Sequence, residues 1–187
     1  MSSALYSVNR SEAAALGLAL IAIAAAWIMP FPASPRHVAR SIGVIVSAVL
    51  VHELAHRQVA RRMGCYSRFV LVPMGFAITV VSAALPIKFL APGYVGISCP
   101  YYAATRRAEL WISASGPLTN LVMASAAALL EAVAYPALMV EAALLNAWLA
   151  FFNLLPLGPL DGAKVFRASP PTWLAMFTWA GFLLYAA

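Results

Sequence analysis

Long apolar runs separated by short polar segments set the pattern of this chain. Five of them approach the roughly 20 residues that a helix needs to cross about 30 Å of hydrocarbon. They cover about residues 13–29, 38–60, 110–133, 137–155 and 172–187. The pattern predicts an all-α membrane protein, a helical bundle of about five to six transmembrane segments.

The segment between the second and third apolar runs differs in texture. Residues 69–81 are rich in β-branched and aromatic side chains and are interrupted by Pro73 and Gly75, which is typical of two short strands around a turn. Residues 85–102 contain several prolines and glycines, and we expect them to be irregular. We therefore expect a small membrane-associated β-hairpin or sheet element beside the helices.

The composition supports a membrane protein. Of the 187 residues, 64% are hydrophobic and only 10% are charged, whereas about 25% is usual for soluble domains. The first apolar run is too long for the h-region of a signal peptide, so we expect no cleaved leader. A helical bundle leaves no room for a soluble accessory domain, which predicts one domain in the cell membrane with several passes.

The basic residues predict the topology. If each apolar run crosses once, ten Lys and Arg side chains fall on one side and only Arg36 and Arg40 on the other. Basic loops stay in the cytosol, so we expect the N-terminus and residues 61–107 to be cytosolic. This asymmetry accounts for the net charge of +6 without nucleic acid as a partner.

A metal-binding pattern lies inside the second apolar run. His52 and His56 stand at i and i+4 of a predicted helix, so both imidazoles project from one face and can hold one zinc ion. Glu53 lies beside them, where a carboxylate can take a proton from a water. A charged group at mid-helix in a membrane costs roughly 2.5–3.5 kcal/mol. The cluster therefore predicts a functional site, and a buried polar contact between helices is the alternative.

A catalytic zinc site needs a third protein ligand. The candidates are His37, Cys65, Cys99, Glu109, Glu131, Glu141 and Asp161. Asp161 is favoured, because it lies at the end of the fourth run at the depth of the histidines. The other carboxylates and His37 lie at the ends of runs or beside the far turn. The two cysteines have no CxxC spacing, and we expect reduced thiols without a role.

Three segments resemble the site-2 protease family of intramembrane zinc metalloproteases. They are HELAH at 52–56, SGPLTN at 115–120 and NLLPLGPLDG at 153–162, in that order along the chain. The chain resembles a minimal archaeal or bacterial-type member, without a PDZ insert or a regulatory domain. The resemblance implies a single transmembrane protease domain over residues 1–187, with a catalytic core at about 38–165.

The resemblance also implies roles for individual residues. His52, His56 and Asp161 would hold one Zn²⁺ per chain, and Glu53 would be the general base. The family suggests that Asn120 and Asn153 lie near the substrate or its oxyanion. A hydrogen bond to a neighbouring helix is the alternative for both.

A strand in the middle segment is a candidate for substrate binding. A peptide bond inside a helix is shielded and must be extended before water can attack it. We therefore expect an edge strand to pair with the unwound substrate by strand addition, and a plain surface connector is the alternative. The strand consists of Phe69, Val70, Leu71 and Val72.

The sequence as a whole predicts a zinc-dependent intramembrane endopeptidase. It would hydrolyse peptide bonds within or near transmembrane helices of substrate proteins, with its active site nearer the cytosolic side. The competing hypothesis is a non-catalytic membrane protein, either a metal-binding scaffold or a transporter. A transporter should show paired half-sequences or two corresponding broken helices, and a catalytically dead relative should have lost a site residue. Neither is the case.

Overall fold

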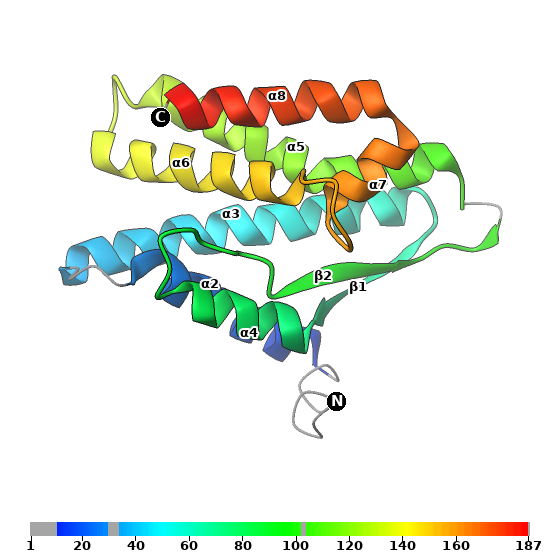
Figure 1. Ribbon diagram of the computed structural model, residues 1–187, viewed down its shortest axis with the longest axis horizontal. Coiled ribbons are helices and arrows are strands. Elements are labelled where there is room, and N and C mark those ends of the chain that lie inside the picture. The colour runs from blue at the N-terminus through cyan, green and yellow to red at the C-terminus, as the bar shows by residue number, and fades with distance from the viewer. Residues whose placement is uncertain (1–10, 30–33, 102–103, 187) are drawn as a thin grey trace. The chain divides into compact units, whose positions relative to one another are not determined.

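The computed structural model describes residues 11–29, 34–101 and 104–186, and most of them are helical (Figure 1). The helices are α2 (Glu12–Ile28), α3 (Pro35–Arg62), α4 (Pro73–Ser82), α5 (Arg106–Leu130), α6 (Pro136–Asn153), α7 (Asp161–Ala168) and α8 (Pro170–Ala186). Two strands, β1 (Tyr66–Leu71) and β2 (Gly93–Ser98), form one sheet. The chain divides into two compact units, one of residues 1–46 and 68–96 and the other of residues 47–67 and 97–187.

The second unit is built around α5, α6 and α8, which run side by side in Figure 1. Their shared core is rich in alanine, and small side chains let membrane helices approach closely. Aromatic rings of α6 and α8 stack beside this core, with Phe151 and Phe177 at 4.9 Å between ring centroids. The buried core residues are Ala114, Leu121, Ala124, Ala147, Ala150, Leu154, Val165, Met176, Ala180 and Leu183.

The first unit contains α2, α4 and most of the sheet. Ala15 and Ala19 of α2 pack on Phe69 and Leu71 of β1. The strands are antiparallel, because the backbone of residue 72 bonds to residue 92 while residue 68 lies against residue 96. The predicted sheet is therefore present.

The predicted hairpin within residues 69–81 is wrong. Pro73 is not in a turn but stands in the first turn of α4, where its fixed φ favours a helix start and its missing N–H is no loss. β1 pairs instead with β2, which lies inside the segment that we expected to be irregular. The pattern of side chains within one segment could not identify this partner, because strand pairing depends on residues distant in sequence.

Within the described part of the chain, three helices are long and apolar enough to cross a membrane: α3, α5 and α6. They correspond to the second, third and fourth predicted runs. Helix α2 is apolar but shorter, at 17 residues, and α8 also has 17. The predicted count of five to six spans is thus not confirmed. The predicted loop at residues 30–35 lies mostly outside the described residues.

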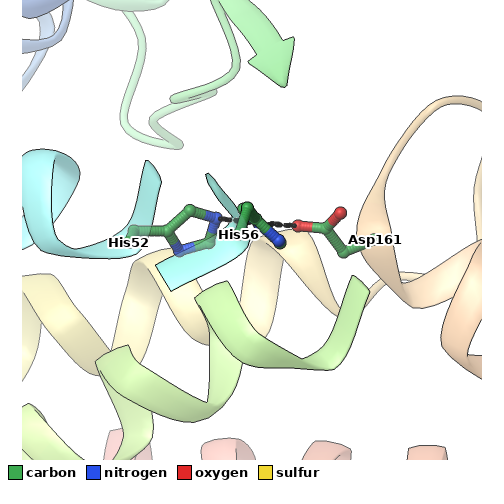
Figure 2. A group of neighbouring side chains, drawn as sticks. All are labelled: His52, His56 and Asp161. Atoms are coloured by element: carbon green, nitrogen blue, oxygen red, sulfur yellow. Dashed lines mark hydrogen bonds and ion pairs between the residues drawn. The ribbon is translucent and has the colours of Figure 1, made fainter. Parts of the chain in front are cut away.

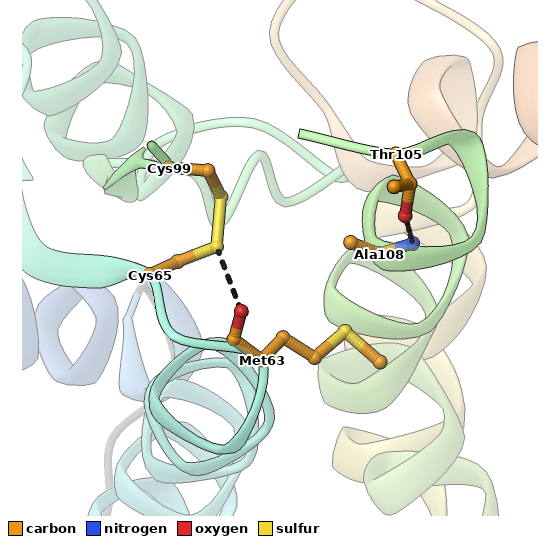
Figure 3. Close-up of a disulfide and its surroundings, with 5 residues drawn as sticks. All are labelled: Met63, Cys65, Cys99, Thr105 and Ala108. Carbon is orange, nitrogen blue, oxygen red and sulfur yellow. Dashed lines mark hydrogen bonds between the residues drawn. A yellow bond between two sulfur atoms is a disulfide. The ribbon is translucent and has the colours of Figure 1, made fainter. Parts of the chain in front are cut away.

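A disulfide joins Cys65 to Cys99 (Figure 3), which corrects the expectation of reduced thiols. Cys65 directly precedes β1 and Cys99 directly follows β2. The register that sets 68 against 96 and 72 against 92 also sets 65 against 99. Their Cα atoms are 4.3 Å apart, close to the roughly 4.5 Å of a directly opposed, non-hydrogen-bonded pair.

Breaking this disulfide should lower stability. Its partners are 34 residues apart, and closing a loop of that length is worth roughly 3–4 kcal/mol in the chain-entropy model. We therefore expect Cys65→Ser to unfold at a lower denaturant concentration than the wild type. Under denaturing, non-reducing conditions the wild-type chain should offer no thiol to maleimide. Two reactive thiols per chain would contradict the assignment.

Candidate metal centre

The second unit brings together His52, His56 and Asp161. The histidines lie one turn apart on α3, and Asp161 is the first residue of α7. Figure 2 shows the three side chains pointing toward one another. The Nε2 atoms of the histidines are 3.1 Å apart. Asp161 Oδ2 lies 3.0 Å from His56 Nε2 and 3.6 Å from His52 Nε2.

These spacings suit a tetrahedral metal ion. Zinc binds nitrogen and oxygen at about 2.0–2.1 Å, so two ligand atoms of a tetrahedral site lie about 3.3 Å apart. The three observed distances bracket that value. Among the described residues, this is the group of His, Cys, Asp and Glu side chains that could share one ion. Two imidazoles and one carboxylate form a donor set that zinc accepts.

The far side of each imidazole is held by another helix. His56 Nδ1 lies 2.7 Å from the carbonyl oxygen of Ile112 on α5, which can only accept, so Nδ1 carries the proton. His52 Nδ1 bonds to the side-chain oxygen of Asn120, also on α5. With Nδ1 protonated on both rings, each Nε2 presents its lone pair to the site.

Gly116 leaves the space that the site occupies. A Cβ at this position of α5 would lie 2.6 Å from His52 Nε2 and closer still to His56 Nε2. No side chain fits there unless the imidazoles move. The glycine of the SGPLTN segment thus keeps one side of the centre open.

Asp161 is fixed by the turn that connects α6 to α7. Gly162 packs so tightly against the end of α6 that a Cβ would lie 2.6 Å from the carbonyl oxygen of Leu155 and nearer to that of Leu154. The indole N–H of Trp173 on α8 donates to the same Leu154 carbonyl at 2.7 Å. The glycine after Asp161 therefore permits a close approach between α7 and α6.

The other end of α7 is tied to α5. Arg106 donates to the carbonyl oxygens of Ala168 and Arg167, at 2.9 and 3.0 Å. Arg167 in turn pairs with Glu109 at 3.2 Å. A cation at the last carbonyls of a helix offsets its dipole, so α7 is stabilised at the end opposite Asp161.

The carboxylate of Asp161 has different neighbours on its two oxygens. Oδ2 faces the histidines, and Oδ1 lies 3.6 Å from the ammonium of Lys164. Burial by itself would raise the pKa of Asp161. Without a metal the histidines can carry a second proton on Nε2, and their attraction and hydrogen bonds then hold that pKa well below its usual range. The side chain is therefore ionised, as a metal ligand must be.

The remaining predicted site residues have separate environments. Glu53 Oε2 is buried and accepts no hydrogen bond from the described residues. The Asn153 amide donates to Leu149 in its own helix, at 2.9 Å. Asn120 lies behind His52, on the side away from Asp161, which suits a residue that orients the ring.

The predicted substrate strand lies in the first unit. Phe69, Val70 and Leu71 belong to β1, while Val72 precedes α4. The backbone N–H of Phe69 donates to Glu12 Oε1 of α2, at 3.0 Å. Its outward-facing donor is therefore already paired within this unit.

Other candidates for the third ligand are engaged elsewhere. His37 Nδ1 lies 2.7 Å from an Arg40 nitrogen, and Cys65 and Cys99 are joined to each other. Sequence analysis missed two residues connected to the centre, Lys164 beside Asp161 and Asn146 behind Asn120. The i, i+3 spacing from Asp161 could have indicated Lys164, and an asparagine inside an apolar run could have indicated Asn146.

Comparison with known proteins agrees with this geometry. The family model of peptidase family M50 matches residues 41–136. A Methanocaldococcus jannaschii protein named "Putative zinc metalloprotease MJ0611" is 32% identical over 155 residues, covering 78% of each chain. Rip3 of Mycobacterium tuberculosis, with the same description, is 32% identical over 133 residues, or 67% of this chain and 29% of Rip3. No solved structure matches.

The family model covers about half of the chain, and the first relative is matched over more than two thirds of both sequences. These relatives are named zinc metalloproteases, and the three converging side chains are close enough to form a metal site. The chain therefore belongs to peptidase family M50, the site-2 protease family of zinc metalloproteases.

Proposed function

We propose that the chain is an intramembrane endopeptidase in which His52, His56 and Asp161 bind one zinc ion and Glu53 is the general base. The convergence of the two Nε2 atoms and Oδ2 within 3.0–3.6 Å carries the proposal. Two of the three side chains lie on α3, one of the helices long and apolar enough to cross a membrane. A metal site with one open position is typical of a catalytic rather than a structural zinc.

The chemistry follows from the protein groups around the ion. When bound, zinc supplies a Lewis acid that polarises a peptide carbonyl and makes a nearby water more acidic. Glu53 directly follows His52 on α3 and has a buried oxygen without a partner among the described residues. It takes a proton from the attacking water and later delivers it to the leaving amine.

The substrate of this site is a transmembrane segment of another protein. Peptide bonds of a membrane helix are shielded until the helix unwinds, and an unwound segment needs hydrogen-bond partners in the bilayer. Residues Phe69 to Val72 would supply them by strand addition, with Asn153 near the substrate. Because Glu12 already accepts from Phe69 N–H, pairing along that edge requires this contact to open.

The active site lies nearer the cytosolic side in this proposal. The basic asymmetry of ten side chains against two supports that orientation. The disulfide between Cys65 and Cys99 lies beside the same basic segment, whereas disulfides are rare in cytosolic proteins outside hyperthermophiles. The two signals favour opposite compartments, so the topology is tested directly below.

Zinc retention should depend on the two residues that shape the centre. Asp161→Ala removes a ligand and Gly116→Ala inserts a methyl group at both Nε2 atoms, so each should lower zinc affinity about tenfold or more. Gly181→Ala is the matched control, because nothing lies within 4 Å of its added Cβ. Competition with a chromophoric chelator measures the affinity. Wild-type affinity in both site variants would remove these residues from the site.

Catalysis should depend on Glu53 while zinc binding does not. Glu53→Gln keeps the size of the side chain and loses the base, and a general base contributes typically 10²–10⁴-fold. We expect a folded, zinc-loaded protein that fails to cleave a model transmembrane substrate in liposomes, whereas wild-type cleavage should stop with phenanthroline. Wild-type rates in the variant, or cleavage after complete zinc removal, would contradict the proposed mechanism.

The segment between β2 and α5 should be accessible from the cytosol. Tyr101 is 99% exposed and can carry a single cysteine, Tyr101→Cys, in a chain lacking Cys65 and Cys99. An impermeant maleimide should label it only after the cells are opened. Labelling in intact cells would reverse the proposed orientation.

A further inference from the structure

A buried chain of hydrogen bonds connects α6 to the candidate metal centre. The Asn120 amide nitrogen donates to Asn146 Oδ1 at 2.7 Å and to the Ala48 carbonyl oxygen at 3.2 Å. The Asn146 amide nitrogen donates to the Ala142 carbonyl oxygen of its own helix at 2.8 Å. Asn120 Oδ1 completes the chain at His52 Nδ1. Asn120 and Asn146 are 0% and 1% exposed, so solvent does not compete for these bonds.

The donors and acceptors of this hydrogen-bond chain can be assigned in only one consistent way. Backbone carbonyls accept and never donate, so the Ala142 oxygen must face the NH₂ group of Asn146. The oxygen of Asn146 then faces Asn120, which must present its own NH₂ group to Asn146 and Ala48. This leaves the oxygen of Asn120 for the ring of His52. The ring can satisfy that oxygen only by carrying its proton on Nδ1.

We propose that Asn146 is a positioning residue of the metal centre, which fixes the tautomer of His52 through Asn120. This inference rests on the proposed zinc site, since the tautomer matters there for the Nε2 lone pair. Asn146 belongs to α6, and its side chain reaches His52 only through Asn120. Its effect is electrostatic and directional: its oxygen keeps Asn120 from turning over.

Removal of Asn146 would allow the opposite arrangement. Without that oxygen, only the Ala48 carbonyl opposes rotation of the Asn120 amide. A rotated amide presents NH₂ to His52 Nδ1, which favours a proton on Nε2 and removes the lone pair that a metal needs. Hydrogen-bond partners behind a metal ligand typically change metal affinity 10–100-fold.

The tautomer can be read in metal-free protein by nitrogen NMR. The chain has three histidines, so ¹⁵N-histidine labelling gives few signals. In the wild type, His52 and His56 should both carry the proton on Nδ1. In Asn146→Leu, the fraction of His52 that lacks a proton on Nδ1 should increase severalfold, while Nδ1 of His56, held by the Ile112 carbonyl, serves as an unchanged internal control.

Zinc affinity is the second readout, and a conservative variant of Asn146 should restore it. Asn146→Leu should bind zinc about tenfold more weakly, by the scale of such outer partners. Asn146→Asp should restore most of the affinity, because a neutral carboxylic acid offers the same acceptor to Asn120 and a donor to Ala142. Thr178→Ala is the control, since among the described residues its hydroxyl bonds only carbonyls of α8.

The outcomes separate this inference from the proposed function. A wild-type His52 without a proton on Nδ1 would overturn the inference even if Asn146→Leu does not fold. So would an unchanged His52 tautomer in Asn146→Leu, or a changed tautomer with unchanged zinc affinity. If the metal-free tautomers behave as expected but the wild type binds no zinc, the zinc site itself fails while the hydrogen-bond chain stands.

Discussion

The structure depends on one constraint: polar groups gathered inside an apolar helical bundle must find their partners within the protein. His52 and His56 are 6% and 4% exposed, and an unpaired ring nitrogen at that depth is unfavourable. Each Nδ1 is paired with α5, through Ile112 or Asn120. These pairings satisfy Nδ1 of each ring and leave Nε2 directed at Asp161. The same bonds that make burial tolerable therefore shape the candidate metal site.

Glycine makes that arrangement sterically possible at two places. Gly116 allows α5 to pass the imidazoles, and Gly162 allows the start of α7 to approach the end of α6. Both lie in regular helix, so the need is for space rather than for an unusual backbone conformation. The SGP and LDG segments are thus explained by close packing around the centre, with Asp161 carried on a short helix stabilised at both ends.

The sequence predicted what depends on local spacing. Apolar runs identified α3, α5 and α6, and the i, i+4 spacing placed His52 and His56 on one face. It failed where long-range pairing decides: the hairpin was predicted at Pro73, whereas β1 pairs with β2, and Cys65 meets Cys99 only through that register. Asn146 was missed because its importance comes from Asn120 on a different helix. The substrate roles of Asn153 and of the strand at Phe69 stay predictions.

X-ray absorption at the zinc edge of the purified protein tests the proposed centre most directly. Two imidazoles and a carboxylate predict a first shell of nitrogen and oxygen alone, at about 2.0–2.1 Å, with the outer scattering of two imidazole rings. Zinc bound in equimolar amount with this spectrum would support the account. A sulfur shell near 2.3 Å, scattering from a third imidazole, or a spectrum unchanged in Asp161→Ala would contradict it.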